Sequence, residues 1–381
     1  MKIATIIGAR PQFIKAAAVS RAISEHNRLS LNGSHLTEII IHTGQHYDEN
    51  MSDIFFQELQ IPKPNYFLDV HELSHGAMTG QMMEKIEKIL LDEKPDIVLV
   101  YGDTNTTLAG ALTAAKLHIP VAHVEAGLRS YNRVMPEEVN RVITDHLSTI
   151  LFCPTETAVN NLKKEGLANI LDSVNPVSPD SPIILNVGDV MYDSVLFYSD
   201  KAENRLDILK ELEVKPQKYG LVTIHRAENT DNSKRLSNIL EALGVVSKDL
   251  LIIWPMHPRN KKFVNQLNFS IDDNRFKVID PVGYLDFLLL EKNAKMIFTD
   301  SGGIQKEAYF FQIPCITLRN ETEWVETIES GFNVLTGSNR AKIIDAYYHG
   351  MEQEPFIKKR LFGDGHASDK IVEVLHKYFI T

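Results

Sequence analysis

Short apolar segments alternate with helix-length segments along almost the whole chain of 381 residues. The apolar runs are rich in Val, Ile and Leu without polar alternation, which is typical of strands buried on both faces of a parallel sheet. They read KIATIIG, EIIIHTG, DIVLVYGD, PVAHVEAG and TILFCPT in the first part, and ILNVGD, YGLVTIH, LLIIWPMH, FKVIDPV, AKMIFTDSGG and PCITLR in the second. Helical patterns such as TGQMMEKIEKILLDEK and KRLSNILEALGVVSK lie between them. This repetition predicts an α/β fold with doubly wound sheets.

The chain length and one polar break divide this pattern into two domains. A chain of this size exceeds one ordinary hydrophobic core, and the segment 172–182, DSVNPVSPDSP, has the composition of a linker. We expect an N-terminal Rossmann-like domain over residues 1–180, joined by a C-terminal helix over 366–381. A second Rossmann-like domain is expected over 181–365, facing the first across a cleft. Ser368 is the predicted N-cap of the last helix.

Charge and composition exclude several classes of protein. The formal net charge of -10 opposes binding to nucleic acid or to an anionic membrane. No signal-peptide pattern follows Met1, and no apolar run reaches the roughly 18 residues of a membrane span, so we expect a cytoplasmic protein. Cys153 and Cys315 lie in apolar stretches and predict buried thiols, with no metal-ligand spacing.

The residues that follow each apolar run carry the functional signal, because ligands of open parallel sheets bind beyond the carboxyl ends of the strands. After the first run, Gly8 ends the strand and Pro11 suits a first helical turn. The new helix N-terminus would present open N–H groups, and Arg10 and Lys15 would add positive charge. This segment predicts a site for a phosphate or a sugar carboxylate. The alternative is that Arg10 and Lys15 are solvated surface charges.

Carboxylates follow the later strands of the first domain. Asp103 lies in VYGDT, Glu125 lies in VEAGLRS, and MPEEVNR supplies Glu137, Glu138 and Arg141. Carboxylates that are held close together or desolvated can differ in pKa, so that one donates a proton while another accepts it. The group therefore predicts acid–base chemistry. The alternative for Glu138 is a structural place in the first turn of a helix.

The second domain offers groups that suit phosphate. In TDSGGIQKE we expect Ser301 to be an N-cap and Gly302 and Gly303 to allow close backbone approach to an anion at the helix N-terminus. Glu307, further along this helix, could face a ribose diol. The alternative for the glycine pair is a plain strand-to-helix turn.

Histidines and arginines follow other strands of this domain. TIHRAEN places His225 after one strand, WPMHPRN places His257 and Arg259 after the next, and LRNETEWVE adds Arg319. The alternative for His257 is a hydrogen-bonded structural histidine. A nucleotide held by the second domain, with its reactive end against the first, is the simplest assembly of these groups.

The blocks GARPQFIK, YGDT, HVEAGLRS, PEEVNR, PTET, HRAEN, TDSGGIQKE and ETEW occur in this order. From residue 1 to about 370 the chain resembles the non-hydrolysing UDP-N-acetylglucosamine 2-epimerases. The resemblance implies two Rossmann-like domains in the GT-B arrangement and a UDP-sugar substrate. It also implies inversion at C2 without nicotinamide, other cofactor or metal. A cytoplasmic homodimer that supplies precursors of bacterial surface polysaccharide is further implied.

The resemblance also implies a mechanism and residue roles. UDP is eliminated to give a 2-acetamidoglucal and then added back with the C2 proton on the opposite face. The implied catalytic residues are Asp103, Glu125, Glu137 and His225, the last as a contact to the UDP phosphates. The implied substrate and UDP ligands are Arg10, Lys15, Arg141, Ser301, Gly302, Gly303, Glu307 and Arg319. Which carboxylate removes the C2 proton stays open.

Two departures from the commonest family pattern concern the substrate. Gln12 stands where GTRPE has a glutamate, and Trp324 stands where TERPE has a basic residue. The chain thus resembles the subgroup that acts on UDP-2,3-diacetamido-2,3-dideoxy-glucuronate, with UDP-N-acetylglucosamine as the alternative. A neutral Gln12 suits a C6 carboxylate, whereas loss of the basic residue argues the other way. Residues 45–48 differ from the family's QHRQ segment, so activation by a second substrate molecule is not expected.

Three rival functions share parts of this pattern. They are a hydrolysing epimerase that releases free sugar and UDP, a GT-B glycosyltransferase, and a non-catalytic protein that binds a nucleotide sugar. A glycosyltransferase would need only one base, so the three carboxylates of the first domain count against it.

Overall fold

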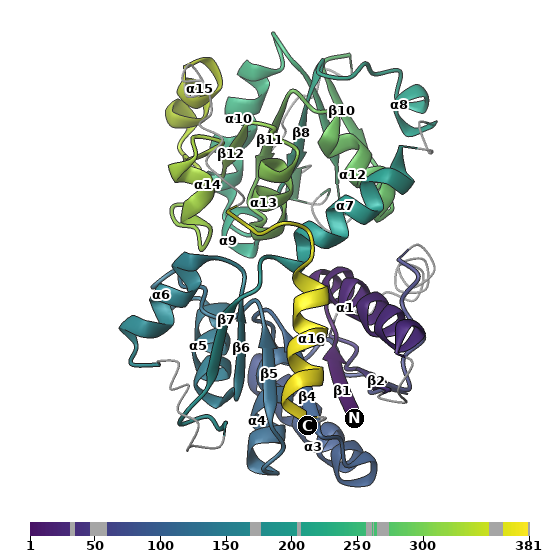
Figure 1. Ribbon diagram of the computed structural model, residues 1–381. Helices are drawn as coiled ribbons and strands as arrows, with labels where there is room; N and C mark the ends of the chain where they lie inside the picture. Colours follow the sequence, from purple (N-terminus) through teal and green to yellow (C-terminus); the bar gives the residue numbers. More distant parts are fainter. Residues whose placement is uncertain are drawn as a thin grey trace. The chain divides into compact units, whose positions relative to one another are not determined.

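The computed structural model describes residues 1–30, 35–45, 59–167, 177–203, 207–256, 261, 263–264, 274–349 and 361–379. The chain divides into two compact units (Figure 1). The first unit comprises Met1–Leu196 and Arg360–Thr381, and the second comprises Phe197–Lys359. Each unit is built on one parallel sheet, and each is described here by itself.

The first unit contains a seven-stranded sheet in the order β3-β2-β1-β4-β5-β6-β7, in which every neighbouring pair is parallel. Its strands are β1 (Lys2–Ile7), β2 (Thr37–His42), β3 (Tyr66–Phe67), β4 (Ile97–Tyr101), β5 (Val121–Val124), β6 (Ile150–Cys153) and β7 (Ile183–Asn186). The central strands are buried on both faces, as their continuous Val, Ile and Leu runs predict.

The helices of this unit cover both faces of the sheet. They are α1 (Arg10–Leu29), α3 (His75–Glu93), α4 (Asn105–Lys116), α5 (Pro136–Leu147), α6 (Glu156–Lys164), the start of α7 (Val190–Ala202), and α16 (Ala367–Phe379). Met82, Ile86 and Leu90 of α3 and alanines of α4 pack on one face, against side chains such as Ala4 and Ile6 of β1. Helices α1 and α16 pack against each other (Figure 1).

The second unit contains a six-stranded parallel sheet in the order β10-β9-β8-β11-β12-β13. Its strands are β8 (Tyr219–Thr223), β9 (Leu251–Pro255), β10 (Phe276–Ile279), β11 (Met296–Thr299), β12 (Cys315–Thr317) and β13 (Asn333–Leu335). Its helices are α8 (Asp207–Glu211), α9 (Ala227–Thr230), α10 (Ser233–Val246), α12 (Tyr284–Lys292), α13 (Gly302–Phe310), α14 (Val325–Glu329) and α15 (Arg340–Tyr348), with the end of α7. The apolar face of α10 packs on Trp254, Phe276 and Phe298 of the sheet.

The predicted α/β class with two doubly wound sheets is confirmed, but one strand belongs elsewhere. The run ILNVGD was predicted to open the second domain after residue 180. It forms β7 and pairs with β6, so it completes the first sheet, and the division falls inside α7 after Leu196. The polar composition of 172–182 gave no information on which sheet the following strand would join. Strands β3 and β13 were not predicted, because they have only 2 and 3 residues.

The last helix begins differently from the prediction. Ser368 is the second residue of α16, not its N-cap. The carboxylate of Asp193 in α7 accepts hydrogen bonds from the backbone N–H groups of Ala367 and Ser368, at 3.1 and 2.7 Å, and from Ser368 Oγ at 2.7 Å. A side chain distant in sequence therefore caps this helix and places it with the first unit.

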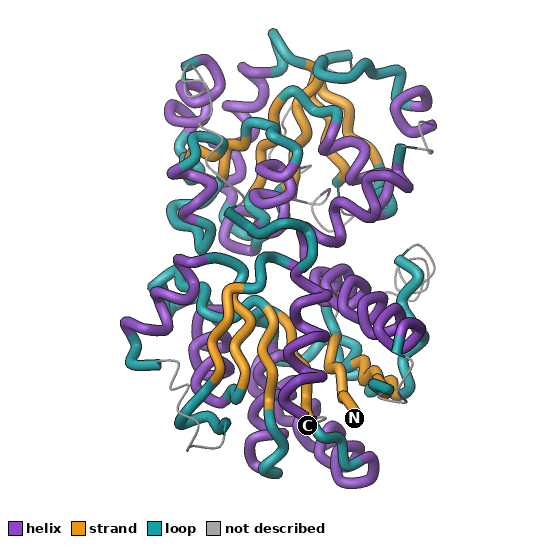
Figure 2. Tube along the Cα trace, in the orientation of Figure 1, coloured by secondary structure: helices purple, strands orange, loops and turns teal. Residues whose placement is uncertain are grey.

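Both sheets change direction of strand order at their centre. In the first sheet the reversal lies between β1 and β4, and in the second between β8 and β11. The loops that leave the carboxyl ends of these strands border the switch point of each sheet (Figure 2). Ligands of doubly wound folds bind at such points, so the loops after β1 and β4 are the candidate site of the first unit, and those after β8 and β11 that of the second.

Candidate active site

The turn after β1 is closed by one buried glutamine. Gln12 Oε1 accepts hydrogen bonds from the backbone N–H groups of Gly8 and Ala9, at 2.9 and 3.0 Å. Its Nε2 donates to the Tyr101 carbonyl at the end of β4, at 2.9 Å, and to Thr107 Oγ1, at 3.0 Å. The predicted open amides are therefore not found at Gly8 and Ala9, whose hydrogens are bound inside the protein. Gln12 instead ties the two strands of the switch point together.

A buried ion pair joins α1 to the end of β5. Lys15 Nζ lies 2.5 Å from Glu125 Oε1, and the side chains are 6% and 8% exposed. Gly102, which follows β4, has a φ of +61°, and a Cβ added there would lie 3.3 Å from Lys15 Nζ. Glu125 itself has a φ of +75°, a conformation that side-chain-bearing residues adopt rarely and often at functional sites. Lys15 is thus no solvated surface charge.

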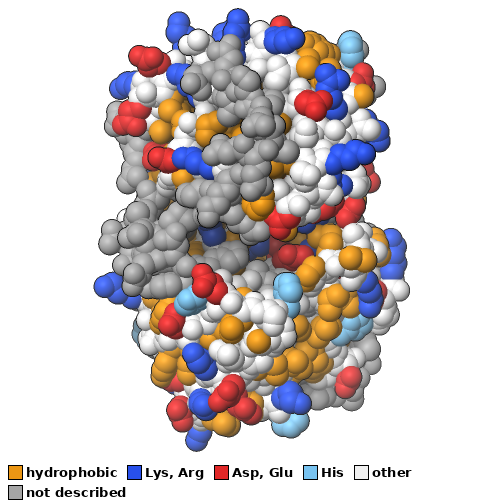
Figure 3. Space-filling view, turned by 180° about the vertical axis from the view of Figure 1, so that it is seen from behind, with side chains coloured by type: hydrophobic (Ala, Val, Ile, Leu, Met, Phe, Trp, Pro, Cys, Tyr) orange, Lys and Arg blue, Asp and Glu red, His pale blue; other side chains and the backbone are white. Residues whose placement is uncertain are grey.

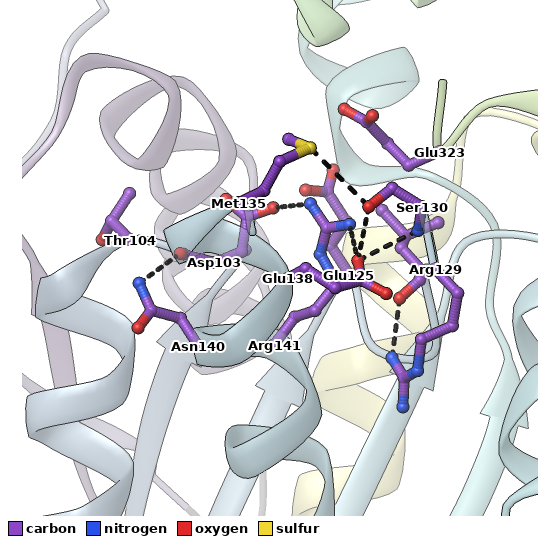
Figure 4. Close-up of polar contacts among 12 residues, drawn as sticks. Asp103, Thr104, Glu125, Arg129, Ser130, Met135, Glu138, Asn140, Arg141 and Glu323 are labelled. Atoms are coloured by element: carbon purple, nitrogen blue, oxygen red, sulfur yellow. Dashed lines mark hydrogen bonds and ion pairs between the residues drawn. The ribbon is translucent and has the colours of Figure 1, made fainter. Parts of the chain in front are cut away.

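Arg141 of α5 gathers two carboxylates (Figure 4). Its guanidinium forms an ion pair with Asp103 and lies 2.6 Å from Glu138 Oε2. The side chains of Arg141 and Glu138 are 3% and 2% exposed, whereas that of Asp103 is 26% exposed. Asp103 is therefore the carboxylate of this trio that a ligand can reach.

The two adjacent glutamates at the start of α5 have different environments. Glu138 accepts hydrogen bonds from Ser130 N, Ser130 Oγ and Tyr131 N, each at 2.9 Å, besides its pairing with Arg141. It holds the loop before α5 in place, which agrees with the structural alternative. Glu137 is partly exposed and forms no hydrogen bond or ion pair with the described part of the chain. Its catalytic role stays a prediction.

Behind these carboxylates lies a buried chain of charges that the sequence analysis missed. His123 of β5 places Nδ1 2.7 Å from Asp145 Oδ1 and Nε2 2.7 Å from the Gly102 carbonyl. Asp145 also pairs with Arg129, which continues to Glu165. Burial alone would raise the pKa of Asp145, but His123 and Arg129 hold that pKa below its ordinary value. Both nitrogens of His123 face acceptors, so the ring supports the turn after β4. A histidine within an apolar run was the available signal.

In the second unit, His225 follows β8 and has a side chain that is 55% exposed. Its Nδ1 lies 3.2 Å from an oxygen of Asp300, a fully buried carboxylate at the end of the neighbouring strand β11. One edge of the imidazole is thus held by the protein while the rest of the ring is open. Asp300 was not identified from the sequence, although it stands directly before Ser301 at a strand end.

The start of α13 has the predicted residues at the predicted places. Ser301 is the N-cap residue, but its hydroxyl makes no capping bond and no hydrogen bond to any described residue. A Cβ added to Gly302 would lie 2.4 Å from Glu323 Oε1, so a side chain at this position would displace the Glu323 carboxylate. At Gly303 the nearest described atom to an added Cβ is Ser301 Oγ, at 3.9 Å. The helix N-terminus suits an anion, with one side occupied by the chain's own Glu323.

The remaining predicted ligands of the second unit have partners within it. Arg319 Nη2 lies 2.9 Å from Glu323 Oε2, and Arg319 is buried. Glu307 is also buried, and its Oε1 accepts a hydrogen bond from the Tyr284 hydroxyl at 3.0 Å. Their contacts to a sugar and to a ribose stay predictions.

Trp324 is buried beneath a lysine. Lys306 Nζ of α13 lies 3.9 Å from the centroid of the Trp324 ring, and both residues are almost fully buried. This geometry is a cation–π contact. Position 324 carries no basic residue, but Lys306 of α13 places a positive charge against the Trp324 ring.

The structure brings together some of the predicted site residues. In the first unit Lys15 and Glu125 lie against the Gly102 turn, which leads to Asp103 and its partner Arg141. Arg10 and Glu137 are both partly exposed, and their roles stay predictions. In the second unit, Arg319 reaches the Gly302 turn through Glu323.

Other predictions fall outside this group or outside the described residues. His257, Arg259 and residues 46–48 lie outside the described residues. Cys153 and Cys315 are buried free thiols, as predicted. Over the described ranges, no cluster of three His, Cys, Asp or Glu side chains is arranged to hold a metal ion. Nor does any described helix combine the length and apolar character of a membrane span.

Comparison with known proteins identifies the family. The family model described as UDP-N-acetylglucosamine 2-epimerase matches residues 30–376. A relative from Methanococcus maripaludis named UDP-N-acetylglucosamine 2-epimerase homolog is 53% identical, covering 98% of this chain and 99% of the relative. The UDP-2,3-diacetamido-2,3-dideoxy-D-glucuronate 2-epimerase of Pseudomonas aeruginosa is 49% identical, covering 99% and 100%.

A solved structure extends this likeness to the fold. The crystal structure of Methanocaldococcus jannaschii UDP-GlcNAc 2-epimerase in complex with UDP-GlcNAc and UDP matches with a TM-score of 0.87 at 45% identity. The match covers 99% of this chain and 100% of that one. The predicted GT-B kind of two-domain fold agrees with this neighbour. The chain belongs to the UDP-N-acetylglucosamine 2-epimerase family.

Proposed function

We propose that this protein is a non-hydrolysing 2-epimerase of a UDP-2-acetamido sugar, an isomerase that inverts C2 by eliminating UDP and adding it back. The observation that carries the proposal is the set of carboxylates at one sheet edge. Arg141 pairs with Asp103, and Lys15 pairs with Glu125. Glu137 is partly exposed and directly precedes Glu138, the other partner of Arg141. Several positioned carboxylates are what proton removal and return on two faces of a sugar ring require.

The reaction needs two proton positions and one leaving group. In the elimination, a carboxylate takes the proton from C2, the C–H electron pair forms the C1–C2 double bond, and the C1–O bond breaks toward UDP. In the return step a UDP oxygen attacks C1, and a carboxyl group delivers a proton to the opposite face of C2. We assign these transfers to Asp103, Glu125 and Glu137 as a group. Arg141 holds Asp103 in position, and Lys15 holds Glu125.

The leaving UDP requires positive charge and hydrogen-bond donors. We assign its diphosphate to His225 and to the first turn of α13, with Ser301, Gly302 and Gly303. We assign the ribose to Glu307, and contacts to the sugar to Arg10, Arg141 and Arg319. Donors aimed at the departing oxygen stabilise the transition state more than the bound substrate.

Two UDP-sugars are candidates for the substrate. Relatives at 49% and 46% identity act, by name, on UDP-2,3-diacetamido-2,3-dideoxy-D-glucuronate and on UDP-N-acetylglucosamine. We propose the uronate. Gln12 is buried and internally bonded, so it would act through the absence of a negative charge rather than by contact. The cation of Lys306 also favours an acidic sugar.

Isotope exchange tests the reaction. Each UDP-sugar is incubated with the purified protein in D₂O without added metal or nicotinamide, and the product is analysed by NMR and mass spectrometry. We expect both C2 epimers of the UDP-sugar with one deuterium at C2. Turnover without label would exclude elimination and re-addition. Release of UDP equal to the sugar consumed would indicate a hydrolysing epimerase, and the ratio of kcat/KM for the two sugars decides the substrate.

Assembly and location complete the proposal. We propose a homodimer in the cytoplasm, where UDP-sugars are made for surface polysaccharide. Apolar side chains gather on the visible face of the first unit (Figure 3), and Val134, Val139 and Ile143 are 91%, 38% and 38% exposed. Light scattering after gel filtration measures the mass. A monomer at micromolar concentration would contradict the homodimer, and activity confined to a membrane fraction would contradict the location.

A further inference from the structure

Asp300 accepts hydrogen bonds from several groups at the second switch point. It lies at the carboxyl end of β11 and is fully buried. Its oxygens accept hydrogen bonds from His225 N at 3.1 Å, from Arg226 N at 3.1 Å and from Asn229 Nδ2 at 3.0 Å. A fourth partner is the His225 ring, whose Nδ1 lies 3.2 Å from Oδ1. One carboxylate thus fixes both the backbone and the side chain of His225.

The contact with Asp300 determines which nitrogen of His225 faces outward. An ionised carboxylate can only accept hydrogen bonds, so its approach to within 3.2 Å of Nδ1 favours the tautomer with the hydrogen on that nitrogen. The nitrogen left for a ligand is Nε2. A diphosphate offers only acceptor oxygens, so Nε2 must also carry a hydrogen to bind it. A ring that makes both contacts is a hydrogen-bond donor at both nitrogens, toward Asp300 on one side and toward the ligand on the other.

Asp300 also links this histidine to the anion site of α13. The strands β8 and β11 are paired, with Thr223 beside Thr299, and the next residues are the His225 loop and the Asp300–Ser301 turn. Ser301 N donates to Thr299 Oγ1 at 3.0 Å. A movement of the Asp300 carboxylate would displace both the imidazole and the residue that precedes the helix N-terminus.

We propose that Asp300 is a positioning residue for the epimerase reaction. It holds His225 with Nδ1–H bound, so that the imidazolium Nε2–H is directed at the diphosphate oxygen that receives the electron pair when the C1–O bond breaks. No proton transfer from His225 is required, since the hydrogen bond alone stabilises the departing charge. This inference rests on the proposed function for its kinetic part and on the contacts of Asp300 for its structural part.

The structural part is tested on the unmodified protein. Nitrogen-15 NMR of histidine-labelled protein, with the His225→Gln variant for assignment, reports which ring nitrogens carry hydrogen. We expect His225 to be protonated at Nδ1 without ligand and at both nitrogens with UDP bound. A free-protein ring protonated only at Nε2 would overturn the proposal. This measurement needs no turnover, so it stands even if the protein proves not to be an epimerase.

The kinetic part is tested with Asp300→Asn, which keeps the shape of the side chain and removes its charge. We expect kcat to fall about 100-fold, as for the loss of one transition-state donor, with KM changed less than about threefold. Asn229→Ala is the matched control, because it removes another donor of Asp300 without touching the imidazole. It should lower the melting temperature but leave kcat within about threefold.

A double-mutant cycle separates positioning from general structural support. If Asp300 acts through His225, Asp300→Asn should cost almost nothing further in the His225→Gln background. Equal losses in both backgrounds would overturn the proposal. If Asp300→Asn does not fold, Asp300→Glu retains the charge at a shifted position and should show altered nitrogen shifts of His225 with a reduced kcat. Normal kcat with altered shifts would equally contradict the proposed role.

Discussion

The two switch points of this protein are built by opposite means. At the first, charged side chains neutralise one another. Lys15 holds Glu125, Arg141 holds Asp103 and Glu138, and these groups are mostly buried. At the second, the elements that face a ligand are a glycine turn, an unbonded serine hydroxyl and a histidine more than half exposed. The charged groups there lie underneath: Asp300 binds mainly backbone, and Arg319 pairs with Glu323 beside the glycine turn.

The difference follows from what each site must do. Carboxylates that exchange protons with carbon need fixed positions and controlled charge, and buried ion pairs supply both. A site that binds and releases a diphosphate needs exposed hydrogen-bond donors, because water can solvate them when no ligand is bound. We therefore expect substitutions of the paired groups at the first point to affect folding and activity together, and substitution of the exposed His225 at the second to affect activity alone.

The largest effect is expected from Lys15→Met. It leaves Glu125 as an uncompensated charge in a site that is 8% exposed, so we expect the free energy of unfolding to fall by about 3–5 kcal/mol, with loss of turnover. Urea denaturation measures the first quantity and the epimerase assay the second.

The double variant Lys15→Met/Glu125→Gln is the matched control. Removing both charges should restore most of the stability, because no unpaired charge remains, but not the activity. If Lys15→Met alone unfolds at the wild-type urea concentration, the pair does not stabilise the unit and the comparison of the two switch points fails.

The adjacent glutamates of α5 sharpen the comparison within the first unit. Glu137→Gln should reduce kcat by about 10²–10⁴, the usual range for a lost acid or base, with no change in melting temperature. Glu138→Gln should reduce the free energy of unfolding by about 1–3 kcal/mol, because Glu138 binds Ser130, Tyr131 and Arg141. If Glu138→Gln lowers kcat and Glu137→Gln does not, Glu138 is the catalytic residue and Glu137 is not.

At the second switch point, His225→Ala should separate activity from stability. The side chain is 55% exposed, so its removal should change the free energy of unfolding by less than about 0.5 kcal/mol. The transition state should lose about 2–4 kcal/mol, as for a single donor to developing charge, measured as kcat/KM. A variant with normal kcat/KM would show that the diphosphate binds elsewhere.

The sequence was sufficient for the sheets because their strands are long, continuous apolar runs, from KIATII in β1 to MIFT in β11. It failed where the signal was tertiary. The pairing of ILNVGD with β6 could not be read from a run that would suit either sheet. Ser368 has ideal N-cap chemistry, yet Asp193, 175 residues earlier, caps the helix.

The candidate site shows the same limit. Strand-end positions led to Asp103, Glu125, His225 and Ser301, since sheet topology alone brings strand ends together. Partners could not be predicted, because they depend on side-chain packing. Glu138 and Glu137 look alike in PEEVNR, but only one faces the loop that needs its oxygens. Gln12 was considered only for its missing charge, and its role as an internal bridge between Gly8, Ala9 and Thr107 could not be predicted.

The expected effect that compares the units directly concerns acid. His42, at the end of β2, stacks on Phe13 and accepts a hydrogen bond from Gly44 N at Nδ1. Burial lowers its pKa from 6.5 to about 4. The folded ring therefore stays neutral while the unfolded chain takes up a proton, so stability is intact above pH 6.5 and falls as the pH drops toward 4. The full loss is about 3 kcal/mol, and only part of it appears at pH 5.

Hydrogen exchange followed by mass spectrometry at pH 7 and pH 5, with rates corrected for pH, locates this effect. We expect protection to decrease in the first unit more than in the second, where the site histidine, His225, is already exposed to solvent. In His42→Asn, whose amide oxygen can still accept from Gly44, the difference between the two pH values should become smaller. An equal decrease of protection in both units, unchanged by His42→Asn, would mean that acid acts through other groups. His42 would then not distinguish the two units.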